Sequence, residues 1–249
     1  MTIVDPRPTV KYLAGHIPRA VNLPVSKTLD KNTLELLPEE RLSETFGEAG
    51  IEAGKTAVFY DSYDGQNAAM LGWVLEYLGH QKVSILASRL EGWTSDGREV
   101  LYRPVKPQPT RFLANPNWSV RALLKELVER RGDKLLDLRS AEEFYGKVAT
   151  EARTGRLPGA TSLPWTSLIG QGNDFLRPKK ELKDIFAAGG LLPTDRMVAY
   201  CTYGPRAAVG YVALREAEFE NVRVYDGSFH QWARNAKLPL EGEGLQLQI

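Results

Sequence analysis

The chain has one cysteine, Cys201, and its surroundings make it the first candidate for chemistry. It follows an apolar run that ends in Tyr200 and precedes an alanine-rich segment, so we expect a strand before it and a helix after it. The N-terminus of a helix has unpaired N–H groups and a partial positive charge, which stabilise the nucleophilic thiolate. A lone cysteine is more often an inert core residue, but this position favours a nucleophile.

The residues after Cys201 suit an anion-binding loop. Gly204 can adopt torsions that other residues avoid, and Pro205 fits the first turn of a helix. Arg206 would add a positive charge, although taken alone it would equally be a solvated helix residue. The candidate substrate-binding loop therefore consists of Thr202, Tyr203, Gly204, Pro205, Arg206 and Ala207.

The sequence around this loop is one half of an internal repeat. Asp5, Arg7, Tyr12 and the stretch 15–20 recur in the same order as Asp137, Arg139, Tyr145 and the stretch 155–160. The offset is 132 residues at the aspartates and 140 at Pro18 and Pro158, which places about eight extra residues in the second copy, between Tyr145 and Gly155. We therefore expect two homologous domains.

A proline-rich stretch separates the copies. Three prolines fall within residues 103–109, which favours an extended, stiff connection. We expect a first domain over 1–103, a linker over 104–112 and a second domain over 113–249. Apolar runs at 57–60, 83–86, 134–138, 197–200 and 222–225 alternate with helical patterns at 68–78, 119–130 and 207–217. The predicted fold class is α/β, with a mostly parallel sheet flanked by helices in each domain.

Composition excludes several classes of function. The formal net charge is +1, so the whole chain has no electrostatic signature for nucleic acid or an anionic membrane. No apolar stretch is long enough to span a bilayer and no secretory leader is visible, so we expect a cytoplasmic protein. One cysteine excludes an internal disulfide, and with three histidines it cannot form a Cys/His zinc cluster.

The repeated motifs resemble those of the rhodanese domain. These are Asp-x-Arg, a tyrosine, Gly-His-Ile-Pro-x-Ala or Gly-Arg-Leu-Pro-Gly-Ala, and the closing segment 225–229 with Trp232. The resemblance covers nearly the whole chain as a tandem rhodanese, the architecture of thiosulfate and 3-mercaptopyruvate sulfurtransferases. It implies a monomeric persulfide enzyme with catalytic Cys201 and neither metal nor organic cofactor. The first copy has Asp61 at the cysteine position, which implies a non-catalytic domain.

Loop length and charge narrow the expected chemistry. Related phosphatases and arsenate reductases have five residues between cysteine and arginine, whereas four separate Cys201 from Arg206, which favours sulfur over phosphoryl transfer. Arg206 favours thiosulfate as the anionic sulfur donor, with cyanide, a thiol or a protein as the acceptor. A 3-mercaptopyruvate sulfurtransferase and a sulfur-relay protein without turnover are the alternatives.

Other charged residues near the second motif have less specific roles. Glu143 stands where vertebrate-type members of the family have an arginine, so Arg153 or Arg156 are candidate substitutes for anion binding. We expect Asp137 and Arg139 to form an ion pair that fixes the following turn, behind the site rather than in it.

Overall fold

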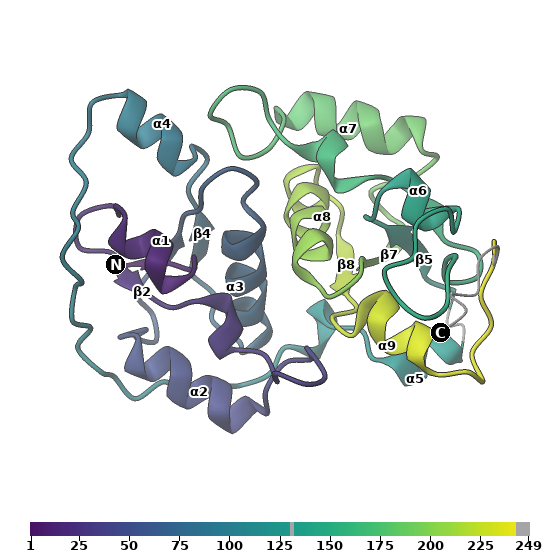
Figure 1. Cartoon of the computed structure of the whole chain (residues 1–249), viewed down its shortest axis with the longest axis horizontal. Coiled ribbons are helices and arrows are strands. Elements are labelled where there is room, and N and C mark those ends of the chain that lie inside the picture. The colour runs from purple at the N-terminus through teal and green to yellow at the C-terminus, as the bar shows by residue number, and fades with distance from the viewer. Residues whose placement is uncertain (130–131, 243–249) are drawn as a thin grey trace. The chain divides into compact units, whose positions relative to one another are not determined.

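The computed structural model describes residues 1–129 and 132–242. The described residues form two compact units, one of residues 1–117 with 169–176, the other of residues 118–129, 132–168 and 177–242. Each unit contains a parallel sheet with helices packed on it (Figure 1). The predicted α/β class with two tandem domains is confirmed.

Within the described residues, the first unit has a four-stranded sheet of order β2-β1-β3-β4. All neighbouring strands are parallel, with Val4 opposite Val21 and Phe59, and Phe59 opposite Ile85. Helix α3 packs on β3 and β4 through an almost wholly buried surface. The elements are β1 (Thr2–Asp5), α1 (Thr9–Leu13), β2 (Val21–Asn22), η1 (Val25–Lys27), α2 (Glu39–Glu48), β3 (Ala57–Phe59), α3 (Gln66–Tyr77), β4 (Val83–Ile85) and α4 (Leu90–Ser95).

The described part of the second unit repeats this order as β6-β5-β7-β8, again parallel throughout. Strand β7 is central, and α8 packs on β7 and β8 (Figure 1). The carboxyl end of β7 therefore leads directly into the predicted loop. The elements are η2 (Trp118–Val120), α5 (Leu124–Val128), β5 (Lys134–Asp137), α6 (Ala141–Phe144), β6 (Thr161–Ser162), η3 (Trp165–Leu168), α7 (Lys179–Ala188), β7 (Arg196–Tyr200), α8 (Pro205–Glu216), β8 (Asn221–Val224) and α9 (Ser228–Arg234).

One buried network holds the centre of the second unit. Arg139 and Asp137 form an ion pair of 2.6 Å, and both side chains are almost completely buried. The Tyr200 hydroxyl donates to the same carboxylate at 2.6 Å, and Arg139 donates to the Gly155 carbonyl at 2.8 Å. Burying charges costs free energy unless they are paired in this way. The ion pair thereby fixes the turn after β5 and the start of the second motif.

The first unit has the same network on equivalent residues. Arg7 pairs with Asp5 at 2.6 Å and donates to the Gly15 carbonyl at 2.8 Å, and the Tyr60 hydroxyl donates to Asp5. In both units the tyrosine oxygen also accepts an N–H two residues after the motif glycine, from Ile17 at 3.1 Å and from Leu157 at 3.3 Å. The duplication therefore extends to individual hydrogen bonds.

The predicted helix over 119–130 is wrong. A short 3-10 turn, η2, ends at Val120, and α5 begins only at Leu124. Between them the Ala122 N–H donates to the Val224 carbonyl at 2.9 Å, and Arg121 forms an ion pair with Asp226 at 2.8 Å. Pairing with the edge of β8 thus overrides the helical spacing of the apolar residues. The predicted end, Arg130, lies outside the described residues.

The stretch expected to be a linker runs extended along the first unit. The Val105 N–H donates to the Tyr12 hydroxyl at 2.8 Å and the Thr110 N–H to the Gly47 carbonyl at 2.9 Å. Phe112 is buried, and the Asn115 N–H donates to the Leu78 carbonyl at 3.0 Å. The compact unit consequently continues to residue 117, beyond the boundary expected at 112/113.

Residues 169–176 also belong to the first unit, although they lie within the second repeat. The Phe175 N–H donates to the Ala87 carbonyl at 2.7 Å, and Arg89 donates to the Gly170 carbonyl at 3.0 Å. The Phe175 ring lies so close to Gly65 that a Cβ there would come within 2.2 Å of it. The segment therefore covers the loop that begins at Asp61.

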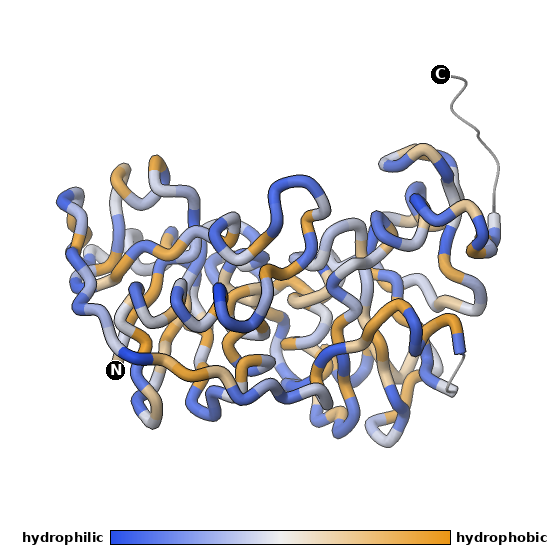
Figure 2. The backbone as a smooth tube through the Cα atoms, turned by 90° about the horizontal axis from the view of Figure 1, so that it is seen from below, coloured by the Kyte–Doolittle hydropathy of each residue, from blue (hydrophilic) through white to orange (hydrophobic). Residues whose placement is uncertain are grey.

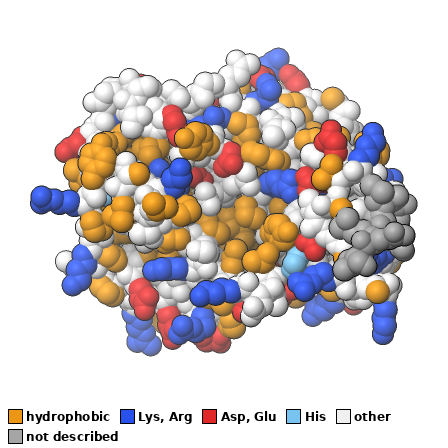
Figure 3. Space-filling model, viewed as in Figure 1, with side chains coloured by type: hydrophobic (Ala, Val, Ile, Leu, Met, Phe, Trp, Pro, Cys, Tyr) orange, Lys and Arg blue, Asp and Glu red, His pale blue; other side chains and the backbone are white. Residues whose placement is uncertain are grey.

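Hydrophobic and charged residues are dispersed along the chain. Hydrophobic stretches alternate with hydrophilic ones throughout the backbone (Figure 2). In the ranges 1–129 and 132–242, no helix combines the length and the apolar character needed to cross a bilayer. On the face in Figure 3, acidic and basic side chains are interspersed, in keeping with the net charge of +1.

Candidate active site

The backbone around Cys201 is held by the start of α9. The Cys201 N–H donates to the Ser228 hydroxyl at 3.1 Å, and its carbonyl accepts the Phe229 N–H at 2.9 Å. The next carbonyl, of Thr202, accepts the His230 N–H at 3.0 Å. Cys201 itself is 1% exposed. These contacts fix the cysteine at the carboxyl end of β7, the edge at which parallel sheets bind ligands.

The residues 201–206, hereafter the Cys201 loop, turn the chain around the sulfur. Gly204 caps α8 with φ 108° and ψ −46°, a conformation that side-chain-bearing residues avoid, and Pro205 occupies the first helical position. The Gly204 N–H donates to the Cys201 Sγ at 3.1 Å. The Arg206 and Ala207 amides follow in the first turn, where N–H groups lack intrahelical acceptors. The loop therefore directs the Gly204 N–H at the sulfur.

Glu143 closes the loop from the side of α6. Its carboxylate accepts two bonds from the Arg206 guanidinium, at 2.7 and 3.0 Å, and one from the Thr202 hydroxyl at 3.1 Å. Arg206 also donates to the Thr202 hydroxyl. Burial alone would raise the pKa of Glu143, but its bonds with Arg206, Ser140 and Thr202 lower it to about 2. Glu143 is therefore ionised and pins both ends of the loop.

Sequence reasoning noticed Glu143 only as a departure from a family pattern. A local signal was present, because Ser140 and Glu143 form a capping box at the start of α6, with the Ser140 N–H donating to the carboxylate at 3.0 Å. That motif places the carboxylate but does not identify Arg206 as its partner. The contact joins residues 63 positions apart, and only the tertiary fold brings them together.

Arg206 interacts with both Glu143 and Cys201. Burial would lower the pKa of the guanidinium, but the hydrogen bond with Glu143 and the nearby Cys201 sulfur raise it. Arg206 is therefore a permanent cation beside the sulfur, with 21% of its side chain exposed. Its charge is matched by the Glu143 carboxylate rather than left for a ligand.

The inserted residues of the second repeat reach the outer edge of the loop. The Glu151 carboxylate lies 2.7 Å from the His230 Nδ1, and the Arg234 guanidinium lies 3.0 Å from the His230 Nε2. Since arginine only donates, Nε2 must accept and the proton must lie on Nδ1, facing Glu151. The Tyr203 ring packs against His230 and is 38% exposed. Tyr203 is thus the exposed edge of the loop.

Arg153 and Arg156 contact the chain that follows α9. Arg153 donates to the carbonyls of Asn235 and Leu238, at 3.1 and 2.9 Å. Arg156 lies 3.3 Å from Glu241 and stacks on the Phe144 ring at 4.5 Å. Through these contacts both side chains fasten the chain after α9.

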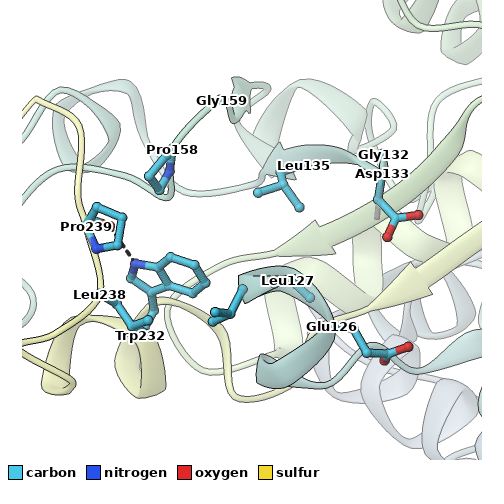
Figure 4. A pocket seen from close by; sticks show the side chains of 11 residues that line it. Glu126, Leu127, Gly132, Asp133, Leu135, Pro158, Gly159, Trp232, Leu238 and Pro239 are labelled. Carbon is cyan, nitrogen blue, oxygen red and sulfur yellow. Dashed lines mark hydrogen bonds between the residues drawn. The ribbon is translucent and has the colours of Figure 1, made fainter. Parts of the chain in front are cut away.

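A pocket of about 240 Å³ in the second unit lies elsewhere (Figure 4). The indole of Trp232 and the side chains of Leu127 and Leu135 line it, beside Asp133 at the amino end of β5. Cys201 follows the carboxyl end of β7, which in a parallel sheet lies at the opposite edge. The pocket therefore does not include the candidate site. Among the described residues, no group of His, Cys, Asp or Glu could hold a metal ion.

The first unit places a carboxylate in the corresponding position. Residues 61–67, hereafter the Asp61 loop, join β3 to α3 as the Cys201 loop joins β7 to α8. Asp61 Oδ2 accepts the N–H groups of Asn67 at 2.7 Å and Ala68 at 3.1 Å, and Oδ1 accepts that of Ser62 at 2.8 Å. Burial raises the pKa of Asp61 to about 6, against the lowering effect of these bonds.

Comparisons with known proteins agree with this geometry. A family model described as a rhodanese-like domain matches residues 1–96 and again 120–235. A thiosulfate sulfurtransferase of Corynebacterium glutamicum is 31% identical, over 92% of this chain and 81% of its own. A protein of Saccharopolyspora erythraea, provisionally named a thiosulfate sulfurtransferase, is 30% identical over 94% of this chain and 87% of its own.

Among solved structures, wild-type EanB matches with a TM-score of 0.88 and 22% identity. The match covers 98% of this chain but 64% of EanB, so the chain spans about two thirds of that protein. A second EanB structure, a cysteine persulfide in a tetrahedral intermediate state with ergothioneine, also has a TM-score of 0.88. At this identity the likeness shows a shared fold.

Proposed function

This chain belongs to the rhodanese-like family of sulfurtransferases, with two domains in tandem, and we propose that it transfers a sulfane sulfur through a persulfide on Cys201. The proposed donor is thiosulfate, and the proposed acceptor is cyanide or a thiol. The donor is supported by the names of the relatives that align with nearly the whole chain. The persulfide is supported by a comparison of Cys201 with Asp61, which stands in the corresponding position of the first unit.

The observation that carries this proposal is the Asp61 carboxylate. From Cβ, an aspartate reaches its oxygen through one intervening atom, and a cysteine persulfide reaches its outer sulfur in the same way. Asp61 Oδ2 accepts two amides at the second and third positions of α3. The equivalent amides of α8 belong to Arg206 and Ala207. The outer sulfur of a Cys201 persulfide would therefore meet N–H groups where the first unit holds an oxygen anion.

In the proposed first step, the Cys201 thiolate attacks the outer sulfur of thiosulfate. A new S–S bond forms at Cys201, the bond between the two sulfurs of thiosulfate breaks, and sulfite leaves with its electron pair. In this proposal the amides of Gly204, Arg206 and Ala207 stabilise the negative charge that stays on the outer sulfur. Because these donors are held in place by Glu143 and α9, little reorganisation is needed during the reaction.

In the second step, the acceptor attacks the outer sulfur. Cyanide takes it to give thiocyanate, or a thiolate takes it to give a new persulfide, and the Cys201 thiolate is restored. No base on the protein is required for the first step. The two steps form a ping-pong cycle, whose signature is a stable sulfur-loaded enzyme in the absence of acceptor.

Intact-mass measurement tests the proposal. The full chain is incubated with thiosulfate, desalted, and weighed before and after cyanide, with Cys201→Ser as the matched control. We expect the wild type alone to gain one sulfur atom and to lose it to cyanide. If the wild type gains no sulfur from thiosulfate or from 3-mercaptopyruvate, the proposal is overturned. Loading without multiple turnover would instead favour a sulfur-relay protein.

A further inference from the structure

The ion pair between Glu143 and Arg206 changes the charge that a substrate meets. The pair is bidentate, the Glu143 side chain is 8% exposed, and the shorter contact is 2.7 Å. The cation nearest the sulfur is thus neutralised inside the protein. At the outer edge of the loop, Glu151 and Arg234 flank His230 with opposite charges. In the proposed reaction Cys201 attacks as a thiolate, so the thiolate and these paired groups together carry a net negative charge.

A dianion is repelled by such a site more strongly than a monoanion is, because the electrostatic energy scales with the charge of the ligand. Thiosulfate carries two negative charges. An organic thiosulfonate presents the same sulfane sulfur and carries only one. The two donors therefore differ chiefly in their negative charge. The Glu143–Arg206 pair should affect the binding of the doubly charged donor more than that of the singly charged one.

We propose that Glu143 is a positioning residue that sets the charge selectivity of the Cys201 site. By holding Arg206 and cancelling its charge, it shifts preference from dianionic donors toward singly charged sulfane donors, such as organic thiosulfonates and persulfides. This inference rests on the proposed sulfur transfer. Compared with a site whose arginine has no carboxylate partner, the Cys201 site would favour donors with a single negative charge.

The first unit provides an internal comparison. Counted from the helix start, Asn67 stands in α3 where Arg206 stands in α8. Counted from the Asp-x-Arg motif, Lys11 stands where Glu143 stands. The unit that lacks the cysteine therefore lacks both members of the pair. This association ties the pair to the reactive sulfur rather than to the fold, which the two units share.

The experiment compares two donors on three forms of the full chain. Rates of sulfur transfer to cyanide are measured with thiosulfate and with methanethiosulfonate for wild type, Glu143→Gln and Glu142→Gln. Glu142 is the exposed neighbour of Glu143 on α6, so its variant removes the same charge without touching Arg206. The glutamine at 143 keeps the size of the side chain and a carbonyl acceptor for the guanidinium.

We expect Glu143→Gln to lower KM for thiosulfate by about tenfold and for methanethiosulfonate by about threefold, with kcat changed less. Glu142→Gln should leave the ratio of the two kcat/KM values as in the wild type. A purely structural role would lower kcat for both donors and leave that ratio unchanged, which would overturn the proposal. If neither donor loads the wild type, the proposed function fails as well, so the two failures are distinguishable.

Discussion

The Cys201 loop and the Asp61 loop occupy the same place in two copies of one fold, yet only one of them holds a side-chain carboxylate on its own amides. In the first unit the Asp61 carboxylate accepts the loop and helix amides itself. In the second unit the Cys201 sulfur accepts the Gly204 N–H at 3.1 Å. The first loop carries its own anion, whereas in the proposed reaction the second would be completed by a transferred sulfur.

The loops also differ in length and cover. Three residues separate Asp61 from the helix cap Gly65, whereas two separate Cys201 from the cap Gly204. Phe175 lies against Gly65, while the outer edge of the Cys201 loop is exposed. Replacing the nucleophile is therefore one of several changes that separate a structural domain from a reactive one. The scaffold network beneath the loops, by contrast, is conserved between them.

The largest expected effect comes from moving the thiol between the loops. Cys201→Ser should lower sulfur transfer by at least about 10³-fold, and adding Asp61→Cys to it should restore nothing. The first loop is one residue longer, has Asn67 in place of Arg206 and is covered by Phe175. The measurement is persulfide loading by intact mass, with turnover to cyanide. A cyanide-removable sulfur on the double variant would show that the nucleophile alone separates the two loops.

A second prediction concerns the buried Asp61 carboxylate. Burial raises its pKa from 3.8 to about 6, so the folded state binds this proton more tightly than the unfolded state does. The stabilisation is complete below pH 3.8 and is lost as pH rises through about 6. The loss amounts to about 3 kcal/mol of unfolding free energy.

Asp61→Asn cannot titrate and serves as the reference. Between pH 4 and pH 7, urea unfolding of the full chain should show the wild type losing about 2.5 kcal/mol relative to this variant. The carboxyl carbon of Asp61 should titrate near pH 6 by NMR. Titration below pH 4 would mean that the amides outweigh burial, and that the carboxylate is a stabilising ligand rather than a tolerated one.

The repeat and the placement of Cys201 were predictable from sequence because both are encoded locally or by simple periodicity. Residues 207–217 have the composition of a helix, and α8 covers them. The incorrect prediction of a helix over 119–130 shows what local patterns cannot predict. Its apolar spacing was helical, but Ala122 pairs with Val224, 102 positions away. No local pattern records that competition.

The candidate site was predictable in part for the same reason. Gly204 and Pro205 predict the turn and the start of the helix, because their own backbone preferences suit these positions. The partnership of Glu143 with Arg206 depends on how α6 and α8 pack, so sequence spacing could not reveal it. Arg153 and Arg156 looked available because their partners, on residues 235–241, are also distant in sequence.

The smallest expected effect tests whether the scaffold beneath the two loops is equivalent. Tyr60→Phe and Tyr200→Phe each remove a hydroxyl that donates to a buried aspartate and accepts a backbone N–H. Each variant should lose about 1–2 kcal/mol of unfolding free energy, measured in urea, because a buried backbone N–H loses its acceptor and the buried aspartate loses one of its donors. Equal losses would show that the two units rely on the network to the same degree.

Tyr60→Phe and Tyr200→Phe should differ in the rate of sulfur transfer even though they lose similar unfolding free energy. Arg139, which shares the carboxylate with Tyr200, stacks on Phe229 at 3.9 Å, and the Phe229 N–H holds the Cys201 carbonyl. Loosening that network displaces the reactive loop, so Tyr200→Phe should lower kcat by up to about tenfold. Tyr60 makes the equivalent contacts in the first unit, with Asp5 and Ile17, and its variant should transfer sulfur at the wild-type rate. Equal loss of activity in both variants would mean that the first unit takes part in the reaction. That result would contradict the proposal that only the second unit is reactive.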